Sequence, residues 1–101
     1  MYGTIFRMKV NPGNELNVAE YFSDWEESHQ PRVDGAMGGL LMRPDSFDGE
    51  MVGVAVFRDK AAYRANADAP RQDEWFRGLR ALLEEDPAWE DGEYVAGRVS
   101  E

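Results

Sequence analysis

The only histidine of the chain, His29, is the residue whose chemistry is easiest to name. Val18, Phe22, Trp25 and His29 recur at spacings of four, three and four, which is typical of one face of a helix. An imidazole on this apolar face, beside Trp25, could enter a pocket and accept a proton near neutral pH. The alternative is a histidine at the helix end that contacts the helix dipole.

A metal site is not expected. Glu26 and His29 form the i, i+3 pair of carboxylate metal sites, but such sites draw a second pair from another helix. The chain has no second histidine and no cysteine, which also excludes disulfides, thiolate zinc sites and a cysteine nucleophile. We therefore expect neither a metal ion nor another cofactor.

Four aromatic side chains are candidates for ligand binding. Phe22, Trp25, Tyr63 and Trp75 could line a pocket for a flat aromatic ligand, because such rings stack on one another and exclude water. Aromatic residues at helical spacing also form ordinary hydrophobic cores, and this alternative stays open.

Three arginines, Arg7, Arg43 and Arg98, fall within segments that the pattern predicts to be strands. A charged side chain there needs water or a partner, so each could hold an anionic ligand or form a salt bridge at an interface. No glycine-rich phosphate loop, Ser-His-Asp set or paired-carboxylate pattern is present, so neither a hydrolase nor a nucleotide-binding protein is indicated.

Length and charge limit the partners further. The 101 residues suit a single domain, 1–101, and the net charge of −9 argues against nucleic acid and anionic membranes as partners. No apolar run is long enough to cross a bilayer, and the amino terminus lacks the pattern of a secretory signal. These observations favour a cytoplasmic protein.

Periodicity and turn residues predict the elements that would position these side chains. Alternation predicts a strand at 2–10, Asn14 is the expected N-cap of a helix that ends at Pro31, and Asp59 is the expected N-cap of a second helix, interrupted at Asp68-Ala69-Pro70. Asp91-Gly92 is interpreted as a turn. The other predicted strands are 36–43, 51–57 and 93–99.

This order predicts an α+β, ferredoxin-like βαββαβ fold, with a four-stranded antiparallel sheet and two helices on one face. The segment 51–57 is apolar at both parities, which is typical of a central strand that is covered on both sides. Because the helices cover only one face, something must cover the other, and a second copy of the chain is the economical answer. We expect a homodimer of the dimeric α/β-barrel type.

The run 54–66, followed by Asp68-Ala69-Pro70 and Trp75-Phe76, resembles the third-strand-to-second-helix signature of the antibiotic biosynthesis monooxygenase family. In that family a strand ending in an aromatic residue leads into a helix with an aromatic residue, a polar residue one turn later, and a break. The resemblance implies a homodimer with a pocket in each protomer between helices and sheet. Members include cofactor-free oxygenases of polycyclic phenols, haem-degrading enzymes and proteins of no known activity.

Asn66 gains its interest from this resemblance, which implies a pocket-facing polar side chain one turn after Tyr63. The alternative is a solvent-facing residue before the break. The haem-degrading branch looks for an Asn on strand one, a Trp on the second helix and a histidine ligand, where this chain offers Phe6 or Arg7, then Asn66, then Arg77. That branch is disfavoured.

Two functions remain. The first is a cofactor-independent, monooxygenase-like protein that binds a hydrophobic aromatic or quinone-type molecule, with His29 and Asn66 as candidate catalytic residues. The second is a non-catalytic dimer that binds a small ligand or another protein.

Overall fold

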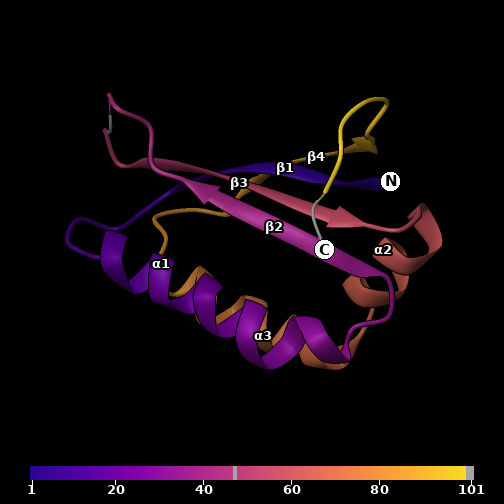
Figure 1. The fold of residues 1–101 in the computed structure, drawn as a ribbon. Helices are drawn as coiled ribbons and strands as arrows, with labels where there is room; N and C mark the ends of the chain where they lie inside the picture. The colour runs from indigo at the N-terminus through magenta and orange to yellow at the C-terminus, as the bar shows by residue number, and fades with distance from the viewer. Residues whose placement is uncertain (47, 100–101) are drawn as a thin grey trace.

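In the computed structural model, which describes residues 1–46 and 48–99, a four-stranded antiparallel sheet is covered on one face by helices (Figure 1). The strand order across the sheet is β2-β3-β1-β4, as the βαββαβ arrangement requires. None of the described helices is long and apolar enough to span a membrane. The elements in chain order are β1 (Tyr2–Lys9), α1 (Glu15–Asp24), η1 (Trp25–His29), η2 (Gln30–Arg32), β2 (Ala36–Met42), β3 (Glu50–Phe57), α2 (Lys60–Ala67), α3 (Pro70–Arg80) and β4 (Ala88–Glu93).

The first helix is not a uniform α-helix up to Pro31. It is α-helical to Asp24, continues as the π-helical turn η1 and ends in the short 3-10 turn η2. The backbone N–H of Gln30 donates to the carbonyl of Trp25, five residues earlier, which is the hydrogen bond of a π-turn. Asn14 occupies the N-cap position, but its side chain makes no capping hydrogen bond.

The second helix is broken as predicted. The Asp59 carboxylate caps α2 by accepting a hydrogen bond of 2.8 Å from the backbone N–H of Ala62. Pro70 opens α3 at a position where a helix needs no N–H donor. α3 ends at Arg80, and Leu83 forms an isolated bridge with Val10 at the end of β1.

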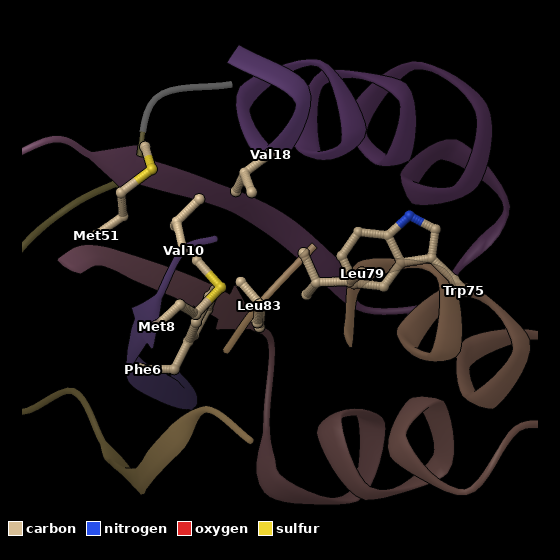
Figure 2. Packing of buried hydrophobic residues seen from close by; sticks show 8 residues of the cluster. All are labelled: Phe6, Met8, Val10, Val18, Met51, Trp75, Leu79 and Leu83. Carbon is tan, nitrogen blue, oxygen red and sulfur yellow. The ribbon is translucent and has the colours of Figure 1, made fainter. Parts of the chain in front are cut away.

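The most deeply buried side chains lie where α1 and α3 meet the middle of the sheet. Met8, Val18 and Leu79 are completely buried there. Figure 2 shows Val18 of α1 and Leu79 of α3 pointing toward side chains of β1, including Met8. These three elements therefore share one hydrophobic core.

The central position of β3 is confirmed, since it pairs with β2 on one side and β1 on the other. Its helix-facing side chains Met51 and Phe57 are buried, whereas Val52 and Val54 on the opposite face are only partly covered. On that opposite face, which we call the open face, Ile5, Leu40 and Met42 are 41%, 75% and 55% exposed. Part of the second face of the sheet is thus apolar and uncovered within one protomer.

The predicted position of the last strand is wrong. β4 spans Ala88–Glu93, so Asp91 and Gly92 lie inside it and not in a turn, and 94–99 contains no strand. The reason is Trp89, which pairs with Phe6 across the β1–β4 ladder with ring centroids 5.0 Å apart. This aromatic contact fixes the strand earlier in the chain than its alternation alone suggests.

Tyr94 ends the ladder and turns onto the open face. Its backbone N–H donates to the carbonyl of Met1, and its hydroxyl lies 2.8 Å from the carbonyl of Ala55. The ring passes over Gly3, where a Cβ would collide with the backbone of Ala55 and approach the Tyr94 ring. Arg98, expected on a strand, lies in the segment that follows.

Gly53 provides the first test of this packing. A Cβ at Gly53 would collide with the ring of Phe6, so Gly53→Ala should lower the free energy of unfolding by about 1–3 kcal/mol through overpacking. Gly92→Ala is the matched control, because a Cβ there meets nothing and such a change stays within about 0.5 kcal/mol. Urea denaturation measures both, and equal stability of the two variants would contradict the packing described.

Candidate functional site

A cavity of about 440 Å³ lies between the helix-facing side of the sheet and the helices α1, η1, α2 and α3. This volume falls within the range of small-molecule sites, roughly 300–1,000 Å³. Its wall is dominated by aromatic rings and includes all three tryptophans of the chain. The aromatic lining residues are Phe6, Phe22, Trp25, Phe57, Tyr63, Trp75, Phe76 and Trp89.

Trp75 organises one side of the cavity. Its ring centroid lies 5.2 Å from that of Phe22, edge to face, and 6.3 Å from that of Trp25. Tyr21 packs on its other side and donates its hydroxyl to the Trp75 carbonyl at 2.8 Å. The Trp25 indole N–H donates to the side-chain oxygen of Gln72 at 3.1 Å. These contacts hold α1 and α3 together and fix the two indoles of the wall.

Five of the six predicted site residues line the cavity: Phe22, Trp25, Tyr63, Asn66 and Trp75. Asn66 is partly exposed, and its side-chain amide has no hydrogen-bonding partner among the residues that the structure describes. Its donors and acceptor are therefore available to a ligand.

His29 is the sixth, and it does not line the cavity. The spacing of four from Trp25 to His29 keeps both on one side only in an α-helix. The π-turn between them is wider, with its hydrogen bond closing over five residues. Trp25 and Glu26 line the cavity at the start of this turn, whereas His29 at its end does not.

A polar group lies at the end of the cavity formed by α2 and β4. The Tyr63 hydroxyl donates to the Asp91 carboxylate at 2.8 Å. Burial, and after it this hydrogen bond, raises the pKa of Tyr63 to about 12, while the nearby Thr4 hydroxyl acts in the opposite direction without offsetting the rise. Tyr63 therefore stays a neutral phenol near neutral pH and is not a base.

Two buried polar atoms of wall residues make no hydrogen bond of good geometry among the described residues: Thr4 Oγ1, which lies near the Tyr63 hydroxyl, and Trp75 Nε1. Thr4 is 3% exposed and Trp75 is 8% exposed, so bulk water does not compensate them. Unpaired buried polar groups are rare in folded proteins because each costs free energy.

Phe6, Trp89 and Asp91 line the cavity but are not among the predicted site residues. The alternation of β1 places Phe6 and Thr4 together on the helix-facing side of the sheet. This alternation could therefore have predicted both Phe6 and Thr4 as cavity residues. Trp89 and Asp91 could not be placed from alternation, because their strand was expected later in the chain.

The charged side chains of the wall are all acidic. Glu26, Asp73 and Asp91 line the cavity, and no Lys or Arg among the described residues does so. Arg7 forms an ion pair of 3.6 Å with Glu50 on the open face, and neither Arg43 nor Arg98 reaches the wall. No three His, Cys, Asp or Glu side chains gather as a metal site in 1–46 or 48–99.

Comparison with known proteins yields structural likeness only. No protein-family model and no curated protein matches the chain. A mutant of SnoaB, a cofactor-independent oxygenase from Streptomyces nogalater, is 21% identical with a TM-score of 0.75, covering 95% of this chain and 94% of its own. A protein of unknown function from Nitrosomonas europaea is 16% identical with a TM-score of 0.79, covering 99% and 94%. An antibiotic biosynthesis monooxygenase is 14% identical with a TM-score of 0.72, covering 95% and 100%.

Thr4 allows a direct test of the wall. Thr4→Val removes the unpaired hydroxyl at nearly constant shape, so it should raise the free energy of unfolding by about 1 kcal/mol. Thr4→Ser keeps the hydroxyl and loses a buried methyl group, and should lower it by about 1 kcal/mol. Chemical denaturation distinguishes the two. A valine variant less stable than the wild type would show that the hydroxyl has a partner in the protein.

The fold expected from the sequence resemblance is confirmed: the chain has the ferredoxin-like α+β fold of the antibiotic biosynthesis monooxygenase-type proteins.

Proposed function

We propose that the cavity binds a hydrophobic aromatic or quinone-type small molecule and that the protein is a cofactor-independent monooxygenase. The observation that carries this proposal is the cavity of about 440 Å³, walled by aromatic rings and containing few polar side chains. Flat rings suit a flat ligand, and sparse polar groups suit a molecule with few oxygens. The likeness in fold to SnoaB, a cofactor-independent oxygenase, supports the chemistry.

Different residues of the cavity would have different roles in binding and in the reaction. Trp25, Trp75 and Phe22 would hold the rings of the ligand and keep water out. The free amide of Asn66 would donate to a ligand oxygen on which negative charge develops. Tyr63, held by Asp91, would offer its oxygen as an acceptor for a ligand hydroxyl.

Such a site can oxygenate a substrate that supplies its own electrons. In a tricyclic phenol with a CH2 in the central ring, dioxygen converts CH2 to C=O and releases water. One oxygen atom enters the product and the other leaves in the water, so all four electrons come from the CH2 carbon. The protein then needs only to bind, orient and exclude water.

The second candidate is a non-catalytic ligand-binding protein, and the position of His29 favours it. With that imidazole outside the cavity, the described wall contains no histidine to act as a proton acceptor. The same aromatic wall would then store or carry a ligand without turnover.

Dithranol, a tricyclic phenol with a central CH2, tests both candidates. With dithranol, the rate of oxygen uptake in the presence of the protein should exceed the rate in protein-free buffer. Asn66→Ala should lower this protein-dependent rate about a hundredfold, because it removes the hydrogen-bond donor to the oxyanion. His29→Ala is the control and should leave the rate unchanged.

Quenching of tryptophan fluorescence by danthron, the corresponding quinone, measures binding separately. Quenching that shows tight binding of danthron, without oxygen uptake above that of protein-free buffer, would favour the non-catalytic protein. No quenching and no uptake would contradict both candidates, and loss of uptake in the His29 variant would assign that residue to the reaction.

We also propose that the open face is covered by a second copy of the chain. Ile5, Leu40 and Met42 expose apolar surface there, and Val52 and Val54 are only partly covered. Tyr94 occupies this face near Gly3 and leaves Leu40 uncovered. Pairing of two such faces would bury what one layer of helices cannot.

Sedimentation velocity tests the dimer. The wild type should sediment as a dimer, and Leu40→Glu as a folded monomer, because a charge there would be buried unpaired at the interface. Leu16→Glu is the matched control, since Leu16 of α1 is 71% exposed against 75% for Leu40 but lies away from the open face. A monomeric wild type, or equal behaviour of the two variants, would contradict the proposal.

A further inference from the structure

The charged groups around the cavity have one sign. Three carboxylates line it, those of Glu26, Asp73 and Asp91, and no cationic side chain in the described part of the chain does. A site built to hold an aromatic acid would be expected to carry at least one Arg or Lys aimed at the acid. The wall of this cavity instead carries only acidic charged groups among the described residues.

These carboxylates differ in how far the protein compensates them. Glu26 has no ion pair or hydrogen-bonding partner among the described residues. Asp91 accepts a hydrogen bond from the neutral Tyr63, which leaves its charge in place. Only Asp73 is paired, with Arg77 at 2.9 Å on the exposed side of α3. Two uncompensated negative charges therefore remain at the wall.

One of these charges, that of Glu26, lies at the start of the π-turn η1. Trp25 and Glu26 are neighbours in the sequence at the start of the turn, and both line the cavity, so its wall contains an indole and a free carboxylate. π-turns inserted into α-helices occur frequently at functional sites. An aromatic surface next to a carboxylate is the combination that attracts organic cations.

The uncharged polar groups that a ligand can reach differ from these carboxylates. The side-chain amide of Asn66 is partly exposed, lines the cavity and has no partner among the described residues. It can donate a hydrogen bond to an uncharged oxygen of a ligand. The accessible polar groups of the wall are thus neutral, and its charged groups are negative.

The charge of the whole chain acts in the same direction. A net charge of −9 gives a negative potential over the molecule, and a cleft lined with the same sign concentrates it. An anionic ligand would meet this potential before it reached any aromatic side chain.

We propose that the cavity selects its ligand by charge: it takes uncharged or positively charged polycyclic aromatic molecules and rejects aromatic anions such as carboxylates. This inference rests on the proposed ligand-binding function and narrows its substrate class. A phenolic substrate would enter in its neutral form, and an amine-bearing aromatic would bind more tightly still.

Three anthracene probes with the same ring system test the inference. Aminomethylanthracene is a cation near neutral pH, anthracenemethanol is neutral and anthracenecarboxylate is an anion, each substituted on the central ring. Energy transfer from tryptophan to anthracene reports binding. The cation should bind the wild type about tenfold more tightly than the anion, with the neutral probe between them. Added salt should narrow this gap by screening the exposed carboxylates.

Variants assign the effect to the wall. Glu26→Gln and Asp91→Asn should each reduce the difference in affinity between the cationic and anionic probes several-fold, since each removes one negative charge. In the Asp91 variant, the Asn side chain can still accept a hydrogen bond from Tyr63. Glu27→Gln is the matched control, because Glu27 lies in the same π-turn but does not line the cavity. It should leave the gap unchanged.

The failures of the two proposals are distinguishable. If the neutral probe binds and the anion binds equally well, the charge selection is wrong and the ligand-binding function stands. The charge selection is also wrong if Glu27→Gln narrows the gap as much as Glu26→Gln, because overall charge would then explain it. If no probe binds at any salt concentration, the ligand-binding function itself is wrong.

Discussion

The contact between Phe6 and Gly53 is the one on which the rest of the site depends. Gly53 lies opposite Phe6 on the helix-facing side of the sheet, and only a residue without a side chain leaves room for the ring. Lying close against the backbone of β3, Phe6 stacks on Phe22 with centroids 5.7 Å apart and contacts Trp89 at 5.0 Å. One ring thereby joins β1, β3, α1 and β4, and it forms part of the cavity wall.

The helix layer is filled in one half and hollow in the other. Where α1 crosses the middle of the sheet, the aliphatic side chains Met8, Val18 and Leu79 are completely buried. Where α1 gives way to η1 and α2 meets α3, large rings replace them and leave a cavity between helices and sheet. Rings that contact one another edge to face hold the helices apart, so the cavity follows from the shapes of the residues that surround it.

The predictable parts of the fold are those where one local pattern decides the structure. Alternation placed β1, the doubly apolar run placed β3 in the centre, and the Asp59 cap with the Pro70 start placed the broken second helix. The same patterns brought Phe22, Trp25, Tyr63, Asn66 and Trp75 to one cavity.

The remaining features depend on contacts that are distant in sequence. β4 is fixed by the pairing of Trp89 with Phe6, which no local alternation reveals, and 94–99 leaves the sheet after Tyr94. The π-turn, which has no pattern in the sequence, takes His29 away from the cavity. Both differences concern the acid-base and charge properties of the site, which is why the sequence predicts the aromatic wall of the pocket better than its chemistry.

If the cavity, and not the open face, is where a flat aromatic molecule binds, the indoles of the wall must sense it. The most direct test is a titration of isotopically labelled protein with danthron, followed by NMR of the indole N–H groups. We predict saturable shifts of the resonances of Trp25, Trp75 and Trp89, all of which line the cavity, while the side-chain methyl groups of Ile5 and Val52 on the open face stay unchanged. Shifts confined to those open-face methyl groups, with the indoles unaffected at saturation, would contradict binding in the cavity.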